Sequence, residues 1–380
     1  MAQSSSAKQS ETSAVREFEL PIAPDSASMS PDEQTLAVII RKADSARQHQ
    51  QPQFILQTWD FRTQKLLEQT QVSLPPSAKP VSAAQSQVQY TNDGGGIAAY
   101  VGGDEISVFK ADSLSPLRQI AVPLPPPSLR LANSRVCDLE VAPTGNLVAL
   151  LICPGGIFDD IRLYDLNTGS LAGEWQHLLV AWRGALSWLP DGSELALAAP
   201  QTMPCHEPLV AIPDIEILNV SSGKIISTFA TGMVPQTIAF TPDRRIYAVD
   251  GNCAGILSNR DPRMKIFDAT SGKTITKVEG RGTGVRYTVS ASADGRRLVA
   301  FVGKVKARWD WGDFVSETYV EDAAFRVWEL PSLTPVSTVI LPHGAFTMFF
   351  TRLKISSHGR YVYCTGGYVQ NGPYAIYEIP

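Results

Sequence analysis

The chain has 380 residues and a formal net charge of −4 at pH 7, with 44% hydrophobic and only 18% charged residues. This balance suits a protein with a large buried core. The slight acidity gives no general electrostatic reason to bind nucleic acid, and no apolar run approaches the roughly 18 residues of a membrane-spanning helix. We therefore expect neither a nucleic-acid partner nor a membrane span.

The N-terminal stretch of residues 1–10 is rich in Ser, Gln and Lys and lacks the apolar core of a signal peptide. Two explanations remain open: a cytoplasmic protein, or the mature form of an exported protein with a methionine added. Because Ala2-Gln3 resembles what remains after a cleavage site, we favour an extracytoplasmic protein, periplasmic or secreted. Residues 1–14 are expected to form a disordered tail.

One pattern returns seven times along the chain: an apolar run, a tight turn based on Pro-Asp-Gly, a second apolar run, and an aromatic residue or Leu followed by a polar residue. The turn residues are Pro31-Asp32, Asp93-Gly94, Pro143-Thr144-Gly145, Pro190-Asp191-Gly192, Pro242-Asp243, Asp294-Gly295 and His358-Gly359. The pairs are Trp59-Asp60, Phe109-Lys110, Tyr164-Asp165, Leu218-Asn219, Phe267-Asp268, Trp328-Glu329 and Tyr377-Glu378, spaced by 49 to 61 residues. A period of this size in a strand-rich chain is typical of a β-propeller.

The fourth repeat shows what one unit contains. Four segments have the composition and spacing of strands, namely residues 185–189, 195–199, 214–218 and 225–229. Pro190-Asp191-Gly192 joins the first two, because Pro presets φ and Gly accepts a positive φ. We therefore expect four-stranded antiparallel blades and an all-β fold, a seven-bladed β-propeller.

The seventh repeat ends at its third strand, close to Pro380. A blade without its fourth strand would leave a long exposed edge. Val15–Leu20 lies ahead of the first repeat and has strand composition, so we expect this N-terminal strand to complete the last blade and close the ring. A single propeller domain is expected over residues 15–380.

The Pro-Asp-Gly turn and the aromatic-Asp pair resemble the repeats of bacterial WD40-like and YVTN-type β-propellers over about residues 15–380. The resemblance implies the fold and says little about activity. The chain departs from regulatory WD40 proteins in two ways. Among the seven pairs only Trp59-Asp60 is literally Trp-Asp, and the Gly-His dipeptide of those proteins is missing.

When the innermost strands are aligned on their turns, alternate residues face the central channel in two stacked rings. The first ring is Ser26, Gln87, Asp138, Ala185, Thr237, Thr288 and Arg352, and the second is Ser28, Gln89, Glu140, Ser187, Ala239, Ser290 and Lys354. Their charge is confined to Asp138 and Glu140 in the third repeat and to Arg352 and Lys354 in the seventh. These four are the candidate ligand-binding residues of a polarised channel mouth. The alternative is that they point into a water-filled channel and bind nothing.

Long connections are expected on the face where the channel opens. One of them, the loop Val302–Asp322, contains Arg308, Trp309 and Trp311. Aromatic and Arg side chains dominate binding hot spots, so these three are the candidate partner-binding residues. In the alternative, the tryptophans pack against their own blade.

Five cysteines occur, and no two have CxxC spacing, so a structural zinc site is not indicated. Cys205 and Cys253 lie in equivalent loops of repeats four and five and are the favoured disulfide. Cys153–Cys205 is the alternative. At least one thiol remains free in either case.

The sequence carries no recognisable catalytic motif. Five histidines are too few for a multi-His metal centre, and no GxSxG elbow or phosphate-binding loop occurs. We therefore expect no cofactor, no metal and no catalytic residue, and a non-enzymatic monomer that binds a protein, a peptide or a small ligand. The alternatives are a lactonase-type hydrolase that uses Asp138, Glu140 and Arg352, and an accessory subunit that docks a redox protein.

Overall fold

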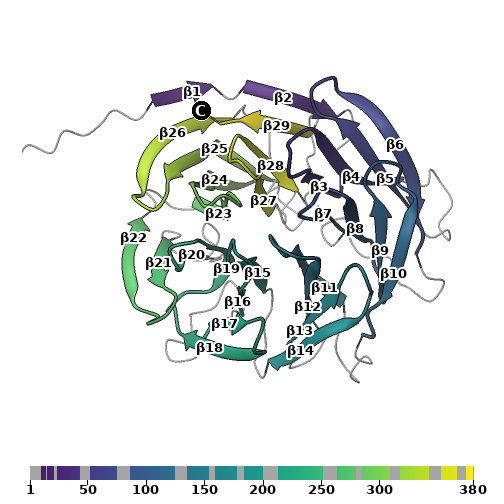
Figure 1. Ribbon diagram of the computed structural model, residues 1–380. Coiled ribbons are helices and arrows are strands. Elements are labelled where there is room, and N and C mark those ends of the chain that lie inside the picture. The colour runs from purple at the N-terminus through teal and green to yellow at the C-terminus, as the bar shows by residue number, and fades with distance from the viewer. Residues whose placement is uncertain are drawn as a thin grey trace, which may run out of the picture.

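The computed structural model describes residues 10–13, 15–20, 24–42, 52–74, 86–124, 135–153, 159–177, 184–199, 213–250, 263–279, 285–308, 317–341, 352–365 and 374–379. Its strands form seven sheets arranged as blades around a central axis (Figure 1). The protein is therefore a seven-bladed β-propeller, as the repeats predict.

Each blade is numbered by its repeat, and its strands are given in order from the channel outward. Blade 1 contains β3 (Ser26–Met29), β4 (Thr35–Lys42), β5 (Gln53–Asp60) and β6 (Lys65–Val72). Blade 2 contains β7 (Gln87–Tyr90), β8 (Gly96–Tyr100), β9 (Glu105–Lys110) and β10 (Pro116–Ala121). Blade 3 contains β11 (Arg135–Val141), β12 (Leu147–Cys153), β13 (Asp159–Asp165) and β14 (Leu171–His177). Blade 4 contains β15 (Ala185–Trp188), β16 (Glu194–Ala198), β17 (Ile215–Asn219) and β18 (Lys224–Phe229).

The remaining blades follow the same order. Blade 5 contains β19 (Pro235–Phe240), β20 (Arg245–Asp250), β21 (Arg263–Asp268) and β22 (Thr274–Glu279). Blade 6 contains β23 (Val285–Ala291), β24 (Arg297–Arg308), β25 (Glu317–Glu329), β26 (Thr334–Ile340) and an added outer strand, β1 (Ser10–Ser13). Blade 7 contains β27 (Arg352–Ile355), β28 (Tyr361–Thr365), β29 (Tyr374–Glu378) and β2 (Val15–Leu20).

The recurrent turn motif caps the hairpin between the first and second strands. A Ser or Thr hydroxyl donates a hydrogen bond to the Asp two residues later, from Ser30 Oγ to Asp32 Oδ1 and from Thr91 Oγ1 to Asp93 Oδ1, both at 2.6 Å. Gly94 follows with a φ of 70°, in the left-handed region that favours glycine. The motif is therefore a local device that stops one strand and starts the next.

The aromatic–polar pair marks the hairpin between the third and fourth strands. Its polar member begins the turn: Asp60 Oδ1 accepts the backbone N–H of Thr63 at 2.7 Å, and Asp165 Oδ1 accepts that of Thr168 at 2.8 Å. These hydrogen bonds hold the pKa of Asp60 and Asp165 below its usual value. The aromatic member points into the apolar layer between blades, as Tyr164 does.

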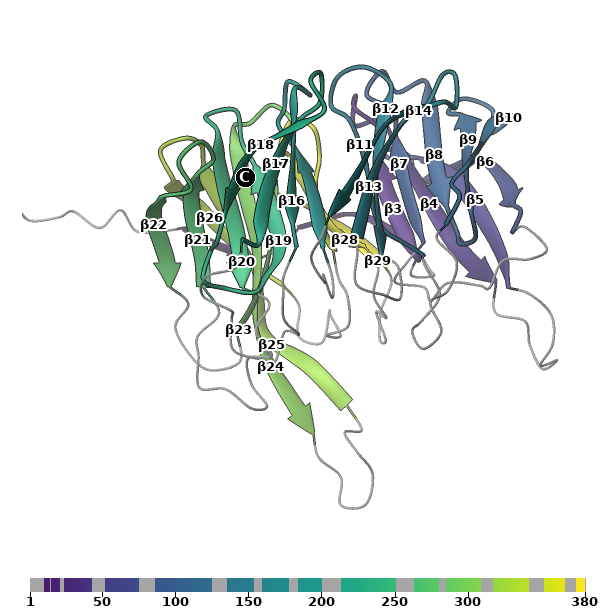
Figure 2. The same ribbon diagram turned by 90° about the horizontal axis from the view of Figure 1, so that it is seen from below.

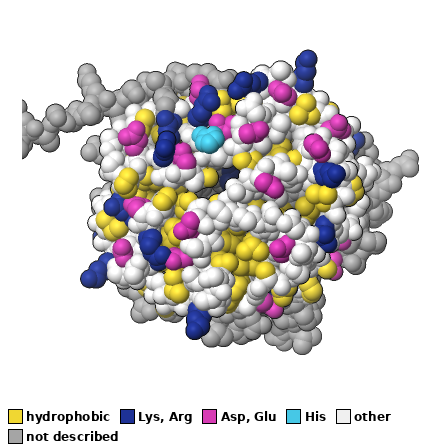
Figure 3. Space-filling model, in the orientation of Figure 1, with side chains coloured by type: hydrophobic (Ala, Val, Ile, Leu, Met, Phe, Trp, Pro, Cys, Tyr) yellow, Lys and Arg dark blue, Asp and Glu magenta, His cyan; other side chains and the backbone are white. Residues whose placement is uncertain are grey.

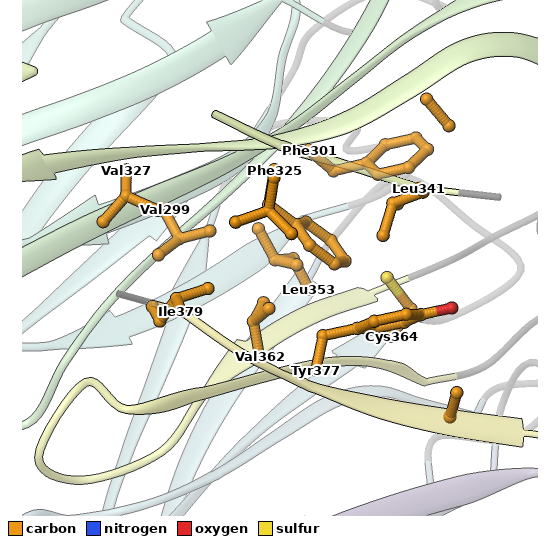
Figure 4. Close-up of a cluster of buried hydrophobic side chains, with 13 residues drawn as sticks. Val299, Phe301, Phe325, Val327, Leu341, Leu353, Val362, Cys364, Tyr377 and Ile379 are labelled. Carbon is orange, nitrogen blue, oxygen red and sulfur yellow. The ribbon is translucent and has the colours of Figure 1, made fainter. Parts of the chain in front are cut away.

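The core of the propeller is divided into layers between neighbouring blades. Figure 4 shows the layer between blades 6 and 7, where Phe301 and Phe325 from one blade face Leu353 and Tyr377 from the other. The rings of Phe325 and Tyr377 lie 5.7 Å apart. Because each blade packs on both neighbours, its second strand is buried on both faces, as β8 and β16 are, whereas an outermost strand such as β6 stays largely exposed.

The N-terminal segment closes the ring from outside, as Figure 1 shows along its upper edge. β2 pairs antiparallel with β29, with Phe18 opposite Ile376, and so completes blade 7 as expected. The disordered tail expected over residues 1–14 needs correction, because Ser10–Ser13 forms β1 and pairs in parallel with β26. The other residues of that tail lie outside the described part of the chain.

The two faces of the ring differ. Figure 2 shows the tight hairpin turns on one face, the tight-turn face, whereas the second strand of each blade ends and the third begins on the opposite face. We call the opposite face the loop-rich face, after the long connections that the sequence places there. β24 and β25 project beyond the loop-rich face as a two-stranded ribbon. The expected loop Val302–Asp322 is therefore corrected over much of its length, because β24 and β25 remain paired as far as Arg308 and Glu317.

Replacing Phe18 tests the closing role of β2. Phe18 is fully buried, and its ring stacks on Phe61 with centroids 5.6 Å apart. We expect Phe18→Ala to lower the free energy of unfolding by about 3–5 kcal/mol in urea denaturation. Glu19→Ala, at the exposed neighbouring position, is the matched control and should change it by less than about 1 kcal/mol. Equal effects of the two changes would contradict this role.

Candidate functional site

The charged residues of the first ring meet across the channel. Arg352 begins β27 in blade 7, and Asp138 lies in β11 of blade 3. Arg352 Nη1 donates to Asp138 Oδ1 at 2.6 Å and to Gln87 Oε1 at 2.7 Å, while Nη2 donates to the Cys137 carbonyl oxygen at 2.5 Å. One guanidinium group therefore ties blade 7 to blades 2 and 3.

The second ring repeats this arrangement one layer deeper. Lys354 Nζ forms an ion pair with Glu140 Oε1, and Gln89 Nε2 donates to Glu140 Oε2 at 2.9 Å. Because side chains two positions apart share one face of a strand, the two ion pairs are stacked. We call the pairs Arg352–Asp138 and Lys354–Glu140 the channel ladder. All four channel residues selected from the sequence are thus brought together.

The pair Arg352–Asp138 is the upper rung of the channel ladder, and Lys354–Glu140 is the lower rung. Because the upper rung is buried, it is more costly to break than a surface ion pair. The Asp138 side chain is only 6% exposed, against 30% for Arg352. Asp138 also accepts the backbone N–H of Leu139 at 3.0 Å and that of Leu186 at 2.9 Å. Removing one partner of a buried pair leaves an uncompensated charge. These charges are therefore bonded to each other, which neither of the two sequence-based interpretations anticipated.

Uncharged ring residues have a role that the sequence analysis missed. The innermost strand of each blade is an edge strand of its sheet. The N–H groups on its unpaired side have no partner within the blade and need other acceptors. Ser26 Oγ accepts the N–H of Val88 at 3.1 Å, and Ser187 Oγ accepts that of Phe240 at 3.0 Å. Side chains of the ring thus fasten one blade to the next. The recurrence of Ser, Gln and Asp at ring positions was the available signal.

This fastening is confined to part of the ring. In blade 4 Ala185 carries no acceptor and Ser187 is left to make this bond, and in blade 5 Ala239 carries no acceptor. The Oγ1 atoms of Thr237 and Thr288 are buried and have no hydrogen-bond partner within the described residues. The channel ladder crosses from blade 7 to blade 3, where ring side chains hydrogen-bond to the next blade. The channel wall therefore has many hydrogen bonds between blades on one side and few on the other.

The described cysteines form a disulfide that was not expected. Cys137 and Cys153 are bonded, with their Cα atoms 5.8 Å apart, and join β11 to β12. The alternative pairing Cys153–Cys205 is thereby overturned, because Cys153 already has a partner in its own blade. The favoured pair, Cys205 and Cys253, lies outside the described residues. The Cys364 thiol is free, and burial raises its pKa well above the usual value.

Of the three partner-binding candidates, Arg308 alone lies in the described part of the chain, at the end of the ribbon. Arg308 is the last residue of β24, with Glu317 opposite it in the register. Trp309 and Trp311 lie outside the described residues. Within the described residues, no group of three or more His, Cys, Asp and Glu side chains could hold a metal ion, and no helix is long and apolar enough to cross a membrane.

A small, shallow apolar groove lies on the rim between blades 3 and 4. Trp175 forms one wall, and its Nε1 donates to the Gly223 carbonyl oxygen of the next blade at 2.6 Å. Leu197, Leu218 and other aliphatic side chains line the rest. Glu216 is the single ionisable residue among the residues lining the groove, so the groove suits an apolar contact rather than acid–base chemistry.

Asp214, just before β17, is a buried carboxyl group with a shifted pKa. Burial raises its pKa to about 6, although Thr231 donates hydrogen bonds to it from its backbone N–H at 2.8 Å and from Oγ1 at 2.6 Å. Lys265 Nζ lies nearby and donates to the Thr231 carbonyl oxygen at 2.7 Å. The carboxyl group thus fixes the entry to β17 on the loop-rich face.

The opposite, tight-turn face offers little electrostatic direction. Figure 3 shows acidic and basic side chains interspersed over the described part of this face around the channel axis. Interspersed charges of both signs give a weak net field. The described part of this face therefore gives no electrostatic signal for a partner.

Comparison with known proteins shows the fold alone. No protein-family model and no curated protein matches the sequence. Among solved structures 1285 chains match, one of them in a structure titled "Crystal Structure of Mitotic Checkpoint Complex". That chain has 14% sequence identity and a TM-score of 0.63, over 100% of this chain and 95% of the other. A fold shared so widely does not specify a function.

Breaking the upper rung should destabilise the ring. We expect Arg352→Met to lower the free energy of unfolding by about 2–4 kcal/mol, because it strands the buried Asp138 carboxylate. Arg360→Met in the same blade is the control, since its pair with Glu378 spans 4.0 Å and is half exposed, so less than about 1 kcal/mol is expected. Urea denaturation measures both, and an Arg352→Met effect no larger than the control would contradict the buried rung.

The Asp214 pKa predicts a pH effect. A folded-state pKa of about 6, above the usual 3.8, means that ionised Asp214 opposes folding above pH 6 and that protonation between pH 6 and 4 relieves this cost. The stability of the wild type relative to Asp214→Asn should therefore rise by about 2–3 kcal/mol as the pH falls from 7 to 4. Urea denaturation at several pH values measures this difference. Parallel stability curves for the two proteins would contradict the shifted pKa.

Proposed function

We propose that this protein is a non-enzymatic binding scaffold of the bacterial WD40-like or YVTN type, acting as a monomer that presents its loop-rich face to a partner protein or peptide. The observation that carries this proposal is the ribbon formed by residues 304–308 of β24 and 317–321 of β25, which projects from that face (Figure 2). Such an element suits a contact with another molecule.

The register gives the ribbon two different faces. Three positions at alternate spacing pair Lys304 with Glu321, Lys306 with Tyr319 and Arg308 with Glu317. The intervening positions pair Val305 with Val320 and Ala307 with Thr318. One face is therefore composed of charged and aromatic residue types and the other of small and apolar ones. Tyr319 and Arg308 are of the residue types that are enriched in binding hot spots.

The channel ladder supports binding over catalysis. A lactonase-type site would use the Asp138 and Glu140 carboxylates as free groups, but both are bonded to cations from blade 7. Mutual neutralisation leaves them poorly placed to act on a substrate. Docking of a redox protein remains one form of the proposed partner binding. The checkpoint-complex title of the structural neighbour also favours a role in assembly.

The disulfide favours an oxidising compartment. Structural disulfides persist in secreted and periplasmic proteins and are rare in the cytosol. The Cys137–Cys153 bond within blade 3 therefore supports the extracytoplasmic location proposed from the N-terminal residues.

Shortening the ribbon tests the binding function. Residues 305–320 are replaced by an Asn-Gly turn, which joins Lys304 to Glu321 at a position where the two strands are already paired. Because the ring core is untouched, the variant should keep its melting temperature within a few degrees. We expect it to lose the partners that the unshortened chain captures from its native source, identified by cross-linking and quantitative mass spectrometry.

The control for this experiment is Lys110→Ala, an exposed position on the tight-turn face. It should retain every captured partner. If the shortened chain captures the same proteins as the wild type in the same amounts, the ribbon is not the binding element. If neither the wild type nor the control captures a protein specifically, the scaffold function is contradicted.

A further inference from the structure

Cys137 joins the disulfide of blade 3 to the upper rung of the channel ladder. It is the extra residue of a β-bulge, since β11 and β12 pair Val136 with Ile152 and Asp138 with Leu151. A bulge leaves its extra residue outside the ladder of strand pairing and redirects the residues beside it. The Cys137 side chain is bonded to Cys153, while the Cys137 carbonyl oxygen is left to accept hydrogen bonds from other blades.

That carbonyl oxygen belongs to the upper rung. It accepts hydrogen bonds from Arg352 Nη2 at 2.5 Å and from Gln87 Nε2 at 3.3 Å. The next residue, Asp138, accepts from Arg352 Nη1 at 2.6 Å. Two of the three acceptors of Arg352 are therefore consecutive residues of the bulge, and a shift of the bulge backbone displaces both together.

We propose that the Cys137–Cys153 disulfide is a redox-sensitive latch for the channel mouth. In the oxidised protein the bond holds the bulge so that Arg352 spans the channel. Reduction frees the bulge and loosens the Arg352–Asp138 rung, while the lower rung, Lys354–Glu140, has no contact with Cys137. β12 ends at Cys153 and β27 begins at Arg352, so the latch acts at the loop-rich face.

A dithiol is the reductant class that this step requires. Its thiolate attacks the sulfur of Cys137, which is half-buried, whereas Cys153 is only 6% exposed. The S–S bond breaks, and its electron pair leaves on Cys153, which takes up a proton. The second thiol of the reductant then displaces Cys137 as a thiol. Two protein thiols and one oxidised dithiol result, so two electrons have been transferred.

The remaining described cysteine does not interfere with this exchange. Cys364 lies in the apolar layer between blades 6 and 7, and burial raises its pKa well above the usual value. A thiol exchanges disulfides as its thiolate, so Cys364 stays inert. Reduction in this part of the chain therefore affects a single bond.

The test compares Arg352→Met with the wild type in both redox states. Dithiothreitol is the probe, alkylation with mass mapping confirms that Cys137 and Cys153 are free, and urea denaturation gives the unfolding equilibrium constant. Any effect of reduction on the unfolded chain is the same in both proteins and cancels. The remaining difference measures the energetic coupling between Arg352 and the disulfide. The quantity compared is the ratio of the unfolding constants of Arg352→Met and the wild type. We expect this ratio to be about tenfold or more smaller in the reduced protein, because the wild type has then already lost about one charge-assisted hydrogen bond.

Lys354→Met is the matched control, since Lys354 makes the lower rung without contacting Cys137, and its effect should be the same in both states. A second measurement uses the wild type alone, in case a variant does not fold. Amide exchange at Leu186, whose N–H donates to Asp138 Oδ2, should accelerate about tenfold on reduction. Exchange at Phe240, bonded to Ser187 Oγ, should not change.

Any of the following results would overturn the latch. One is a bond that resists dithiothreitol in the folded protein. Another is an Arg352→Met effect, or a Leu186 exchange rate, that is the same in the oxidised and the reduced protein. Cys137→Ser combined with Cys153→Ser should reproduce the reduced behaviour without reductant, and oxidised-like exchange at Leu186 in that variant also contradicts the proposal.

Discussion

Packing of every blade on both of its neighbours is the constraint on which this structure depends. An apolar layer fills each interface between blades, so the seventh blade is buried on both faces only when it also packs on the first. Two devices close the ring. From outside, β2 completes blade 7 and β1 adds to the neighbouring blade 6. From inside, Arg352 and Lys354 reach across the channel to blade 3. Both devices act on the blade where the chain must return to its beginning.

The same constraint occupies the charged groups of the channel, which supports the proposed use of the loop-rich face for binding. Innermost strands need acceptors for their outward N–H groups, and ring side chains such as Ser26 and Asp138 supply them. Charges that satisfy one another across the axis are not free for acid–base chemistry. The β24–β25 ribbon has the opposite character, because it extends beyond the layers that stabilise the ring. A rigid ring with a projecting element is how a widely shared fold acquires an individual partner.

Much of the fold could be predicted because its signals are local. Turn residues such as Asp32 and Asp60 bond within a few positions of themselves, so the sequence displays them directly. β1 could not be predicted, since Ser10–Ser13 has no apolar alternation and is held by pairing with a distant strand. Alternation also placed Asp138 and Arg352 on the channel without indicating that their side chains would meet. The Cys137–Cys153 bond forms at a bulge, and a bulge leaves no mark on the spacing of residues in the sequence. The ribbon did have a visible signal, the alternation Lys304-Val305-Lys306, but the length of the segment Val302–Asp322 favoured a loop.

A high-resolution electron-density map of the channel is the most direct test of this account. The account predicts continuous side-chain density for Arg352, with its guanidinium group in direct contact with Asp138, and Lys354 paired with Glu140 one layer deeper. Arg352 turned toward solvent, with ordered water or a bound ligand separating it from Asp138, would contradict it. In that case the charges would form an open site rather than a closure, and the catalytic alternative would gain ground over the scaffold.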